Sequence, residues 1–547
     1  MRKKRDASVL LGEALQKIEA EFRGLPLFSR PRSEALYHYV AALEAEGLGE
    51  SLLPLDARKL GFHVHRRAVE SSCVAVPAMF DYCRPDSGND IQFDRATFLE
   101  ARDLHEFAYR YEQIKFSNRL AEKGLFSIHA AQRDPRITFC YASEAADEVG
   151  TLRKARELHE LFSAERLTVD RAEIEAASNE LTAQLSGHVK RVEPEACEFQ
   201  FAEALFPIIR NLGRALVKTV PHDMASDVAV GSLSFSDLRE FWGALLALSS
   251  AYQWATDIAA EHDIWKFPIR SAVLRLPTER ASEIIAGVIN LPMQEVERLV
   301  RCYTYDIRIA GSVPIVQPLL PVGYGTVCFP FSLIHGNNFE RNFFKLLQRH
   351  PALLPFRCDV ENRKEPIAIE QLRSMFPAPK YKTKGCLVIP GLTDADLVVY
   401  EVETGFVLVI QHKWLLEPDS ADESEANNEK LRVGARQSVE AIDFSREHRA
   451  FLSCTLGLTD SEAMDRIEAV AVCRGGEPNE FLPDQAVPII TEVAFAGLRK
   501  STSTLAELWK ALKSRPDKTD AAAKAVEGQF RVELAGYEFV MPGLAIR

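Results

Sequence analysis

Acidic, amide and basic side chains gather at the ends of a short stretch with strand-like alternation. In residues 393–414, TDADLVVYEVETGFVLVIQHKW, Asp394 and Asp396 open one predicted strand, and Gln411 and Lys413 close a second one. Successive side chains on a strand point to opposite faces. Asp394 therefore shares a face with Asp396, and Gln411 shares a face with Lys413.

The turn between the two predicted strands decides whether these pairs meet. Gly405 can adopt the positive φ that a tight turn needs. A two-residue loop at Thr404-Gly405 sets Asp396 directly opposite Lys413, on one side of the sheet. A three-residue loop shifts the register by one residue and sends the two pairs to opposite faces. The interpretation of this stretch as a site depends on that register.

A carboxylate, an amide oxygen and a lysine on one face suit the chemistry of a hard divalent cation. Mg²⁺ takes oxygen ligands and keeps several waters. A lysine beside it can orient an attacking water or stabilise negative charge on a phosphate. The alternative is an ordinary hairpin with a polar end, and the flanking elements must decide between the two.

Residues 336–350, GNNFERNFFKLLQRH, predict a helix that buries a glutamate. Asn337 or Asn338 can cap its first turn. Its apolar stripe consists of Phe339, Phe343, Phe344, Leu346 and Leu347. Glu340 falls inside this stripe at helical spacing. Since burying an unpaired glutamate is costly, we expect a partner, which is a metal ion, Lys413 or another basic residue.

A small basic cluster, Lys380, Lys382 and Lys384, lies just before the two predicted strands. These lysines could contact backbone phosphates of a nucleic acid. A solvated lysine loop is an equally good interpretation.

The order of these parts resembles the PD-(D/E)XK nuclease superfamily. A helix with Glu340 is followed by a strand with Asp396, a strand with Gln411-His412-Lys413, and then a helix. The pattern is most similar to Mrr-type restriction endonucleases, in which the acidic residue of the E-x-K half-motif is commonly glutamine. Gln437, in ARQSVEAIDF, matches a glutamine often seen in the next helix of that family.

The resemblance implies metal-dependent hydrolysis of phosphodiester bonds. Asp396 and Glu340 would bind Mg²⁺ or Mn²⁺, and Gln411 would add an oxygen ligand or hold a water. Lys413 would position the attacking water, and Asp394 is the runner-up for the metal-binding aspartate. DNA is the substrate that the resemblance implies, with restriction or anti-phage defence as the setting. The alternative function is a degenerate nuclease fold that binds nucleic acid or a protein partner.

The bulk composition is that of a globular protein. The chain has 547 residues, 47% hydrophobic and 26% charged, with a formal net charge of −12. This charge argues against a generally basic nucleic-acid coat and leaves room for a local basic cleft. Ten scattered cysteines without a C-x-x-C pair, and no segment suited to a bilayer, predict a cytoplasmic protein. A homodimer or a defence-system partner protein is compatible with this composition.

We expect a multidomain chain, with a large, mainly α-helical N-terminal region followed by an α/β domain with a central mixed sheet. The latter is of the restriction-endonuclease type that the resemblance implies, over residues 335–500. The predicted divisions are a helical region 1–190, which includes a helix within 148–167, a helical region 191–330, a nuclease-like domain 331–515 and a C-terminal hairpin 516–547.

Two segments carry further expectations. Residues 279–303 have degenerate helix-turn-helix spacing with Asn290 at the turn, but Glu295 and Glu297 would oppose DNA phosphates. A structural helical hairpin is therefore favoured. The acidic insertion 417–429 predicts a solvated loop, with a regulatory cover over the site as the alternative.

Overall fold

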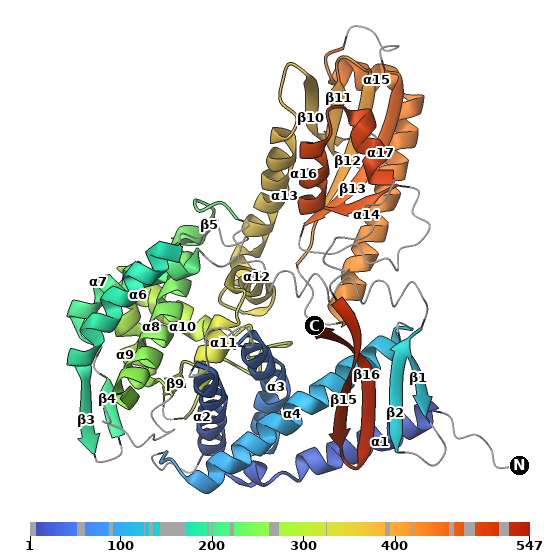
Figure 1. The fold of residues 1–547 in the computed structure, drawn as a ribbon. Helices are drawn as coiled ribbons and strands as arrows, with labels where there is room; N and C mark the ends of the chain where they lie inside the picture. Colours follow the sequence, from blue (N-terminus) through green and yellow to red (C-terminus); the bar gives the residue numbers. More distant parts are fainter. Residues whose placement is uncertain are drawn as a thin grey trace, which may run out of the picture.

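Helices make up most of the residues that the structure describes, and one unit carries a five-stranded sheet (Figure 1). The computed structural model describes residues 7–51, 61–86, 91–124, 126–130, 135–142, 171–193, 196–199, 201–218, 224–261, 273–323, 325–388, 394–416, 421–458, 464–474, 487–513 and 525–546. No helix within these ranges combines the length and apolar character needed to cross a membrane.

The first four long helices share one apolar core. They are α1 (Ala7–Arg23), α2 (Arg32–Ser51), α3 (Gly61–Tyr82) and α4 (Arg95–Glu122), with a short 3₁₀ turn, Pro26–Ser29, between the first two. Asp94 caps α4 by accepting a hydrogen bond from the Thr97 backbone N–H. The helix expected within 148–167 lies outside the described residues.

The C-terminal hairpin belongs to this N-terminal body. Its strands β15 (Ala525–Leu534) and β16 (Tyr537–Ile546) turn at Ala535-Gly536, both at positive φ, which confirms the predicted hairpin. Strand β16 pairs in parallel with β2 (Arg136–Tyr141), which pairs with β1 (Phe126–Ala130). The region predicted as helical therefore contains half of a four-stranded sheet that the chain's end completes.

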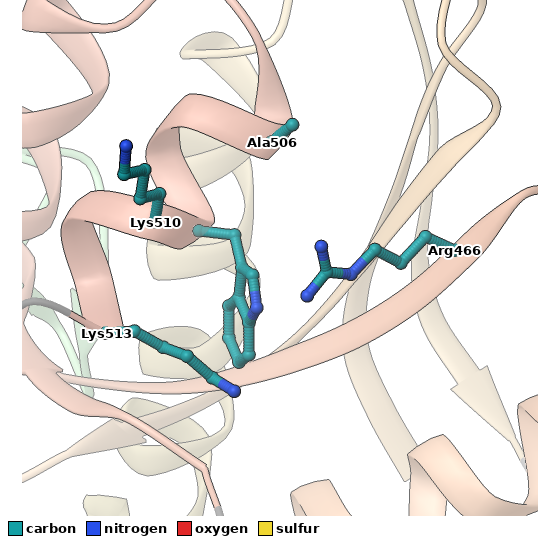
Figure 2. Close-up of a pocket in the computed structure, with 5 residues that line it drawn as sticks. Arg466, Ala506, Lys510 and Lys513 are labelled. Carbon is teal, nitrogen blue, oxygen red and sulfur yellow. The ribbon is translucent and has the colours of Figure 1, made fainter.

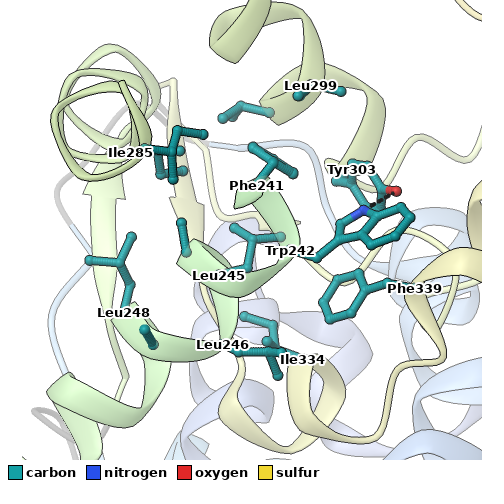
Figure 3. Close-up of a cluster of buried hydrophobic side chains, with 14 of the residues drawn as sticks. Phe241, Trp242, Leu245, Leu246, Leu248, Ile285, Leu299, Tyr303, Ile334 and Phe339 are labelled. Atoms are coloured by element: carbon teal, nitrogen blue, oxygen red, sulfur yellow. Dashed lines mark hydrogen bonds between the residues drawn. The ribbon is translucent and has the colours of Figure 1, made fainter. Parts of the chain in front are cut away.

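A second apolar core gathers the middle helices (Figure 3). Its helices are α6 (Arg171–Leu185), α7 (Phe206–Val217), α8 (Phe235–Glu261), α9 (Thr278–Ile289), α10 (Met293–Tyr303), α11 (Phe331–His335) and α12 (Phe339–Arg349). Trp242 donates its indole N–H to the Tyr303 hydroxyl at 2.7 Å, which satisfies both buried polar groups. Asn290 ends α9 in the left-handed conformation expected for the hairpin turn.

Short strands and 3₁₀ turns connect these helices. They are Ser186–His188, β3 (Val189–Glu193), β4 (Ala196–Phe199), Glu203–Leu205, β5 (Ala229–Val230), β6 (Leu233–Ser234), β7 (Arg275–Pro277), β8 (Leu320–Pro321), β9 (Thr326–Cys328) and Leu354–Phe356.

The predicted domain boundary at residue 331 is corrected by the packing of α12. The whole apolar stripe of α12 is buried in the middle helical core, together with Leu353 and Val360. The α/β unit therefore begins with the next helix, α13 (Arg357–Ser374), which contributes Val360 to the helical core and Leu372 to the core of the α/β unit.

The α/β unit is a three-layer sandwich around a mixed sheet. Its remaining elements are β10 (Tyr381–Val388), β11 (Asp394–Glu401), β12 (Phe406–Trp414), α14 (Ala421–Glu447), α15 (Arg449–Thr455), β13 (Arg466–Arg474), β14 (Ile489–Thr491), α16 (Glu492–Ser501) and α17 (Leu505–Lys513). The strand order is β10-β11-β12-β13-β14, antiparallel up to β12 and parallel beyond it.

Two apolar clusters hold the layers of this sandwich together. One joins the sheet to α13, α16 and α17, and the other joins it to α14 and α15. The acidic insertion is not wholly a loop, since α14 already begins at Ala421, while residues 417–420 lie outside the described ranges. The expected multidomain layout of helical regions followed by an α/β unit with a mixed sheet is thus confirmed at this level.

Candidate functional site

The ladder between β11 and β12 leads to the predicted polar residues. It runs from the pair Tyr400–Val407 to the pair Leu397–Ile410 and ends there. Just beyond its end, the His412 backbone N–H donates a hydrogen bond to the Asp396 side chain, which places Asp396 against the last part of β12, the part that bears Gln411 and Lys413. That Asp396 and Lys413 share one face of the sheet stays a prediction.

The loop between these strands differs from the expected two-residue turn. Residues 402–405 lie outside the ladder, and the Gly405 N–H bonds to the Glu401 carbonyl at 3.0 Å. Gly405 takes a φ of 65°, in the left-handed region. A four-residue loop displaces the register by two residues from the predicted one, so Asp396 is not directly opposite Lys413 as a two-residue loop would have it. An even displacement preserves the faces within the ladder.

Asp396 is buried and carries an unusual proton affinity. Its side chain is 4% exposed, and its Oδ2 accepts a 2.5 Å hydrogen bond from the His412 backbone N–H. The pKa of Asp396 is raised to about 7, chiefly by burial, which outweighs the lowering effects of that hydrogen bond and of the Lys413 charge. The negative charge of Glu365 and a hydrogen bond with its side chain are smaller causes that act in the same direction as burial.

Glu365 is the acidic partner that the sequence interpretation missed. It lies on α13, the helix directly before the strands, and its side chain is hydrogen-bonded to Asp396. Glu365 is exposed and precedes Pro366, so no apolar stripe draws attention to it. The usable signal was its place in the chain, because α13 is the helix that immediately precedes β10, β11 and β12.

Glu340 is not brought to this site. It is 2% exposed in the middle helical core, where its Oε1 accepts a 2.6 Å hydrogen bond from the Met224 backbone N–H. Its Oε2 pairs with Arg239 at 3.1 Å. The sequence argument that a buried glutamate needs a partner holds, but the partner is Arg239. The expected role of Glu340 as a metal ligand beside Asp396 is therefore corrected.

The amide oxygens of the two predicted glutamines are buried and have no hydrogen-bond partner within the described residues. Gln411 is 3% exposed, and its Oε1 accepts no hydrogen bond within the described part of the chain. The same is true of Gln437 Oε1 on α14. A buried acceptor left in this state is costly, which is the state expected of an oxygen that awaits a ligand.

These groups fit a divalent cation with oxygen ligands. Among the described residues no three His, Cys, Asp or Glu side chains are grouped as a metal site, so the donor set is smaller than a full cage. Asp396 and Glu365 supply two carboxylates, and Gln411 supplies an unsatisfied amide oxygen. Mg²⁺ commonly binds through one or two carboxylates and keeps several waters, so this set suits it.

The aliphatic stem of Lys413 packs against a glycine of α14. A Cβ built on Gly434 of α14 would lie 3.1 Å from both Cγ and Cε of Lys413. The lysine stem therefore lies against the one position of this helix where a side chain is missing. The positive charge of Lys413 also acts on the Asp396 carboxylate.

The remaining predicted residues lie nearby but are engaged differently. His412 faces the other side of the sheet, 3.9 Å from Glu492, as the alternation predicts. Asp394 is exposed at the start of β11. Lys380 donates to the Ser503 carbonyl at 2.6 Å, and Lys382 to the Gly457 carbonyl at 3.0 Å.

The lysines of β10 also have a structural use. Lys382 and Lys384 are exposed on β10, which is an edge strand of the sheet. Charged side chains on an edge strand discourage pairing with another sheet. This placement, together with the contacts of Lys380 and Lys382, favours a structural interpretation of the basic cluster.

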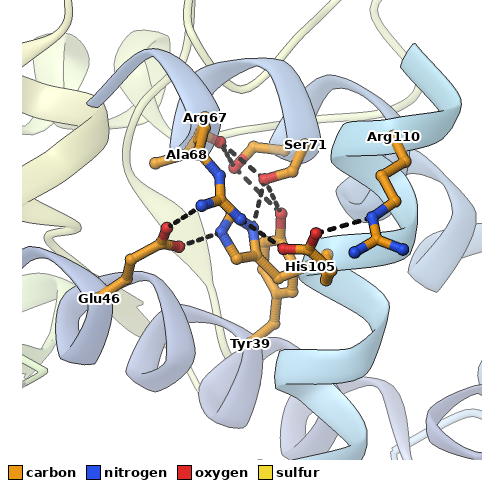
Figure 4. Close-up of polar contacts among 9 residues, drawn as sticks. Tyr39, Glu46, Arg67, Ala68, Ser71, His105 and Arg110 are labelled. Carbon is orange, nitrogen blue, oxygen red and sulfur yellow. Dashed lines mark hydrogen bonds and ion pairs between the residues drawn. The ribbon is translucent and has the colours of Figure 1, made fainter. Parts of the chain in front are cut away.

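A polar cluster elsewhere has the residue types of a hydrolase (Figure 4). Ser71 Oγ lies 2.6 Å from Nδ1 of His105, and the Nε2 of that ring bonds to Glu46. Arg67 pairs with Glu46 at 2.9 Å. Burial raises the pKa of Glu46, but the His105 hydrogen bond and the nearby charges outweigh it, so the pKa is lowered. Because Ser71 has no exposed surface, this cluster fastens α2, α3 and α4 together.

A cavity of about 460 Å³ lies at the far end of the sheet (Figure 2). Its lining residues are Arg466, Ala506, Trp509, Lys510 and Lys513. Arg466 begins β13 and pairs with Phe406, the first residue of β12, whereas Lys413 pairs with Cys473 near the other end. This basic hollow is therefore separate from the candidate site.

Comparison with known proteins identifies no relative, since no family model, curated protein or solved structure matches the chain.

Proposed function

We propose that the chain is a metal-dependent nuclease that hydrolyses phosphodiester bonds, with DNA as its substrate. The observation that carries this proposal is the approach of Glu365 and Lys413 to Asp396 at one end of a mixed sheet, beside the part of β12 that also bears Gln411. The resemblance to PD-(D/E)XK nucleases implies a helix, the strands with Asp396 and with Gln411 and Lys413, a helix and a further strand. The elements α13, β11, β12, α14 and β13 follow this order, with α13 in the place first assigned to the helix of Glu340 and β10 as an additional strand.

Each residue of the site has a distinct task in this proposal. Asp396 and Glu365 would hold Mg²⁺ or Mn²⁺, which when bound supplies positive charge to a phosphodiester oxygen. Gln411 offers its unsatisfied oxygen to the ion or to a water, and Gln437 can hold a second water. Lys413 directs its ammonium at the attacking water and at the phosphoryl oxygens, where negative charge develops.

The biological setting is proposed from the same resemblance. A nuclease of the Mrr-like kind would act in the cytoplasm, in restriction or anti-phage defence. The helical regions would then select the target or receive a signal, alone, as a homodimer or with a defence-system partner.

Cleavage by the full-length protein tests the proposal. Plasmid, linear and single-stranded DNA, and RNA, are incubated with the protein and Mg²⁺, Mn²⁺ or EDTA. We expect metal-dependent cleavage that disappears in Asp396→Ala and in Lys413→Ala. Lys500→Ala, which removes an exposed lysine of α16, is the matched control and should cleave normally.

The second candidate function is a degenerate nuclease fold that binds nucleic acid or a protein partner. It is favoured by the neutral side chain of Gln411, by the formal net charge of −12 and by the acidic insertion 417–429. Metal-independent binding, with no cleavage of any of these nucleic acids, would support this function over the nuclease.

A further inference from the structure

Helix α13 is shared between two apolar cores. Val360, in its first turn, is buried in the middle helical core, and Leu372, in its last turn, is buried against the sheet. Glu365 lies between these two anchors. The position of this carboxylate therefore depends on how the helical region and the α/β unit are held relative to one another.

The helix has a built-in weak point directly after Glu365. Pro366 lies inside α13 and has no backbone N–H, so the hydrogen bond to the Asn362 carbonyl cannot form. A missing helical hydrogen bond is a common place for a helix to bend. The helix can therefore bend at Pro366, so that its first half moves with the middle helical core and its second half moves with the sheet.

A cation and two aromatic rings hold the two units together beside this point. Lys364 Nζ lies 3.7 Å from the ring centroid of Phe344 on α12, and 6.0 Å from that of Trp414 at the end of β12. Trp414 also packs against the middle helical core, as does Leu416. Lys364 precedes Glu365 and Trp414 follows Lys413, so each site residue is next to a contact with the helical region.

Arg474 is a second cation beside the Trp414 ring. Its guanidinium lies 4.5 Å from the Trp414 ring centroid and pairs with Glu492 at 2.5 Å. The same arginine bonds to the Gln371 side chain of α13. Helix α13 and strand β12 are therefore linked on both sides of Glu365, through Lys364 and through Gln371.

We propose that Lys364 and Trp414 are positioning residues that make the nuclease site dependent on the helical region. They act through their neighbours, because the Lys364–Phe344–Trp414 contact holds Glu365 and Lys413 at the distance that Asp396 requires. A movement of α12 against the sheet would separate these groups. This inference rests on the proposed nuclease function.

Paired variants of the full-length protein test the inference. Lys364→Met removes the cation, Lys364→Arg keeps it, and Arg363→Met removes an exposed neighbouring cation of α13 as the control. Cleavage of DNA at saturating Mn²⁺, the Mn²⁺ affinity of the protein alone and the thermal unfolding temperature are measured for each. We expect Lys364→Met to lower the cleavage rate by between about tenfold and a hundredfold, as for other small misplacements of catalytic groups.

The other readouts separate positioning from folding. Lys364→Met should weaken Mn²⁺ binding and leave the KM for DNA and the unfolding temperature nearly unchanged, while Lys364→Arg restores the rate. If Lys364→Met unfolds at a much lower temperature than the wild type, the same measurements are made on Trp414→Leu. Trp414→Phe, which keeps an aromatic ring, should then restore the cleavage rate. An inactive wild-type protein that binds no Mn²⁺ overturns the proposed function. An active wild type with an equally active Lys364→Met variant overturns the positioning role alone.

Discussion

The side chains of Glu365 and Asp396 are joined by a hydrogen bond, although one comes from a helix and the other from a strand. Burial is the main cause that raises the pKa of Asp396 to about 7, and the charge of Glu365 adds to it. Two carboxyl groups that share a hydrogen bond repel each other once both are ionised. A divalent cation between them would remove the repulsion. Gln411, at the end of β12, has an amide oxygen that accepts no hydrogen bond within the described residues and could join the cation.

Replacing Glu365 by glutamine is expected to lower DNA cleavage by roughly a hundredfold, a typical loss for one preorganised electrostatic contact. The side chain keeps its size, but one of the two carboxylates for the cation is gone. The initial rate of plasmid cleavage at saturating Mn²⁺ and the Mn²⁺ affinity should fall together. Since Glu365 is exposed, the unfolding temperature should stay the same.

Glu340→Gln should lower the stability of the protein and leave DNA cleavage unchanged, in contrast to Glu365→Gln. It leaves Arg239 without its buried carboxylate, and breaking one partner of such a pair commonly costs about 3–5 kcal/mol. We expect the helical region to unfold at a lower temperature than in the wild type, as measured by circular dichroism. The cleavage rate should be unchanged at a temperature where the variant is folded. Loss of cleavage in Glu340→Gln with unchanged stability would return Glu340 to the site.

Gly434→Ala is expected to separate activity from stability. The new methyl group would meet the Lys413 stem at 3.1 Å, so the lysine must move. Alanine favours a helix interior over glycine by about 1 kcal/mol, which offsets the crowding. The cleavage rate should fall severalfold while the unfolding temperature holds or rises. Gly497→Ala on α16 is the matched control, because nothing lies within 4 Å of its new Cβ.

The sequence was sufficient for the part of the site that depends on alternation. The period of two along β11 and β12 is local, and it correctly identified both strands, with the Asp396 side chain bonded to the backbone of β12 at His412. The exact register was missed because the loop closes over four residues, with the Gly405 N–H on the Glu401 carbonyl. Loop closure depends on packing against the rest of the sheet, which periodicity does not contain.

The acidic partner could not be found in the same way. A glutamate within an apolar stripe must be buried and paired, and the sequence predicted this for Glu340. Whether the pair is a metal or Arg239, about a hundred residues earlier in the chain, is a question of tertiary contact. Glu365 leaves no such pattern because it is exposed. The pairing of β16 with β2 is likewise a tertiary contact that local pattern does not contain, since the paired residues Arg136 and Glu538 are 402 positions apart in the sequence.

A pH-dependent stability is expected from Glu44 of α2. Burial raises the pKa of Glu44 to about 8, while hydrogen bonds from the Ser332 and Phe331 backbone N–H groups lower it. The unfolded chain releases this proton near its ordinary value of 4.5, but the folded chain keeps it to about 8. The stability contributed by the protonated carboxyl is therefore complete below pH 4.5 and is lost as the pH rises to 8.

Glu44→Gln should remove this dependence of the free energy of unfolding on pH. The amide keeps an acceptor oxygen and carries no charge, so the variant should gain stability over the wild type as the pH rises from 5 to 8. The gain should reach a few kcal/mol, at about 1.4 kcal/mol per pKa unit. Thermal unfolding at several pH values measures it, with Glu447→Gln at the exposed end of α14 as the control. If the unfolding temperatures of Glu44→Gln and the wild type change with pH in the same way, Glu44 is not buried in its protonated form.

Gln411→Glu should make the fold itself depend on metal. The new carboxyl would be buried beside Asp396, so at pH 8 it places a further negative charge next to Glu365 and Asp396. Without metal, the variant should unfold at a lower temperature than the wild type, because buried like charges repel. Mn²⁺ should then raise its unfolding temperature more than that of the wild type, because tighter binding to the folded state gives a larger stabilisation at the same Mn²⁺ concentration.

The control for this prediction is Gln529→Glu, which adds the same charge at an exposed position of β15. It should lower the unfolding temperature little and should respond to Mn²⁺ as the wild type does. Mg²⁺ should raise the unfolding temperature of Gln411→Glu as Mn²⁺ does, and EDTA should reverse the increase caused by either metal. If Mn²⁺ shifts Gln411→Glu and the wild type equally, the Gln411 oxygen does not face a cation. The buried and unpaired oxygen at that position would then have to be assigned to a hydrogen bond with substrate.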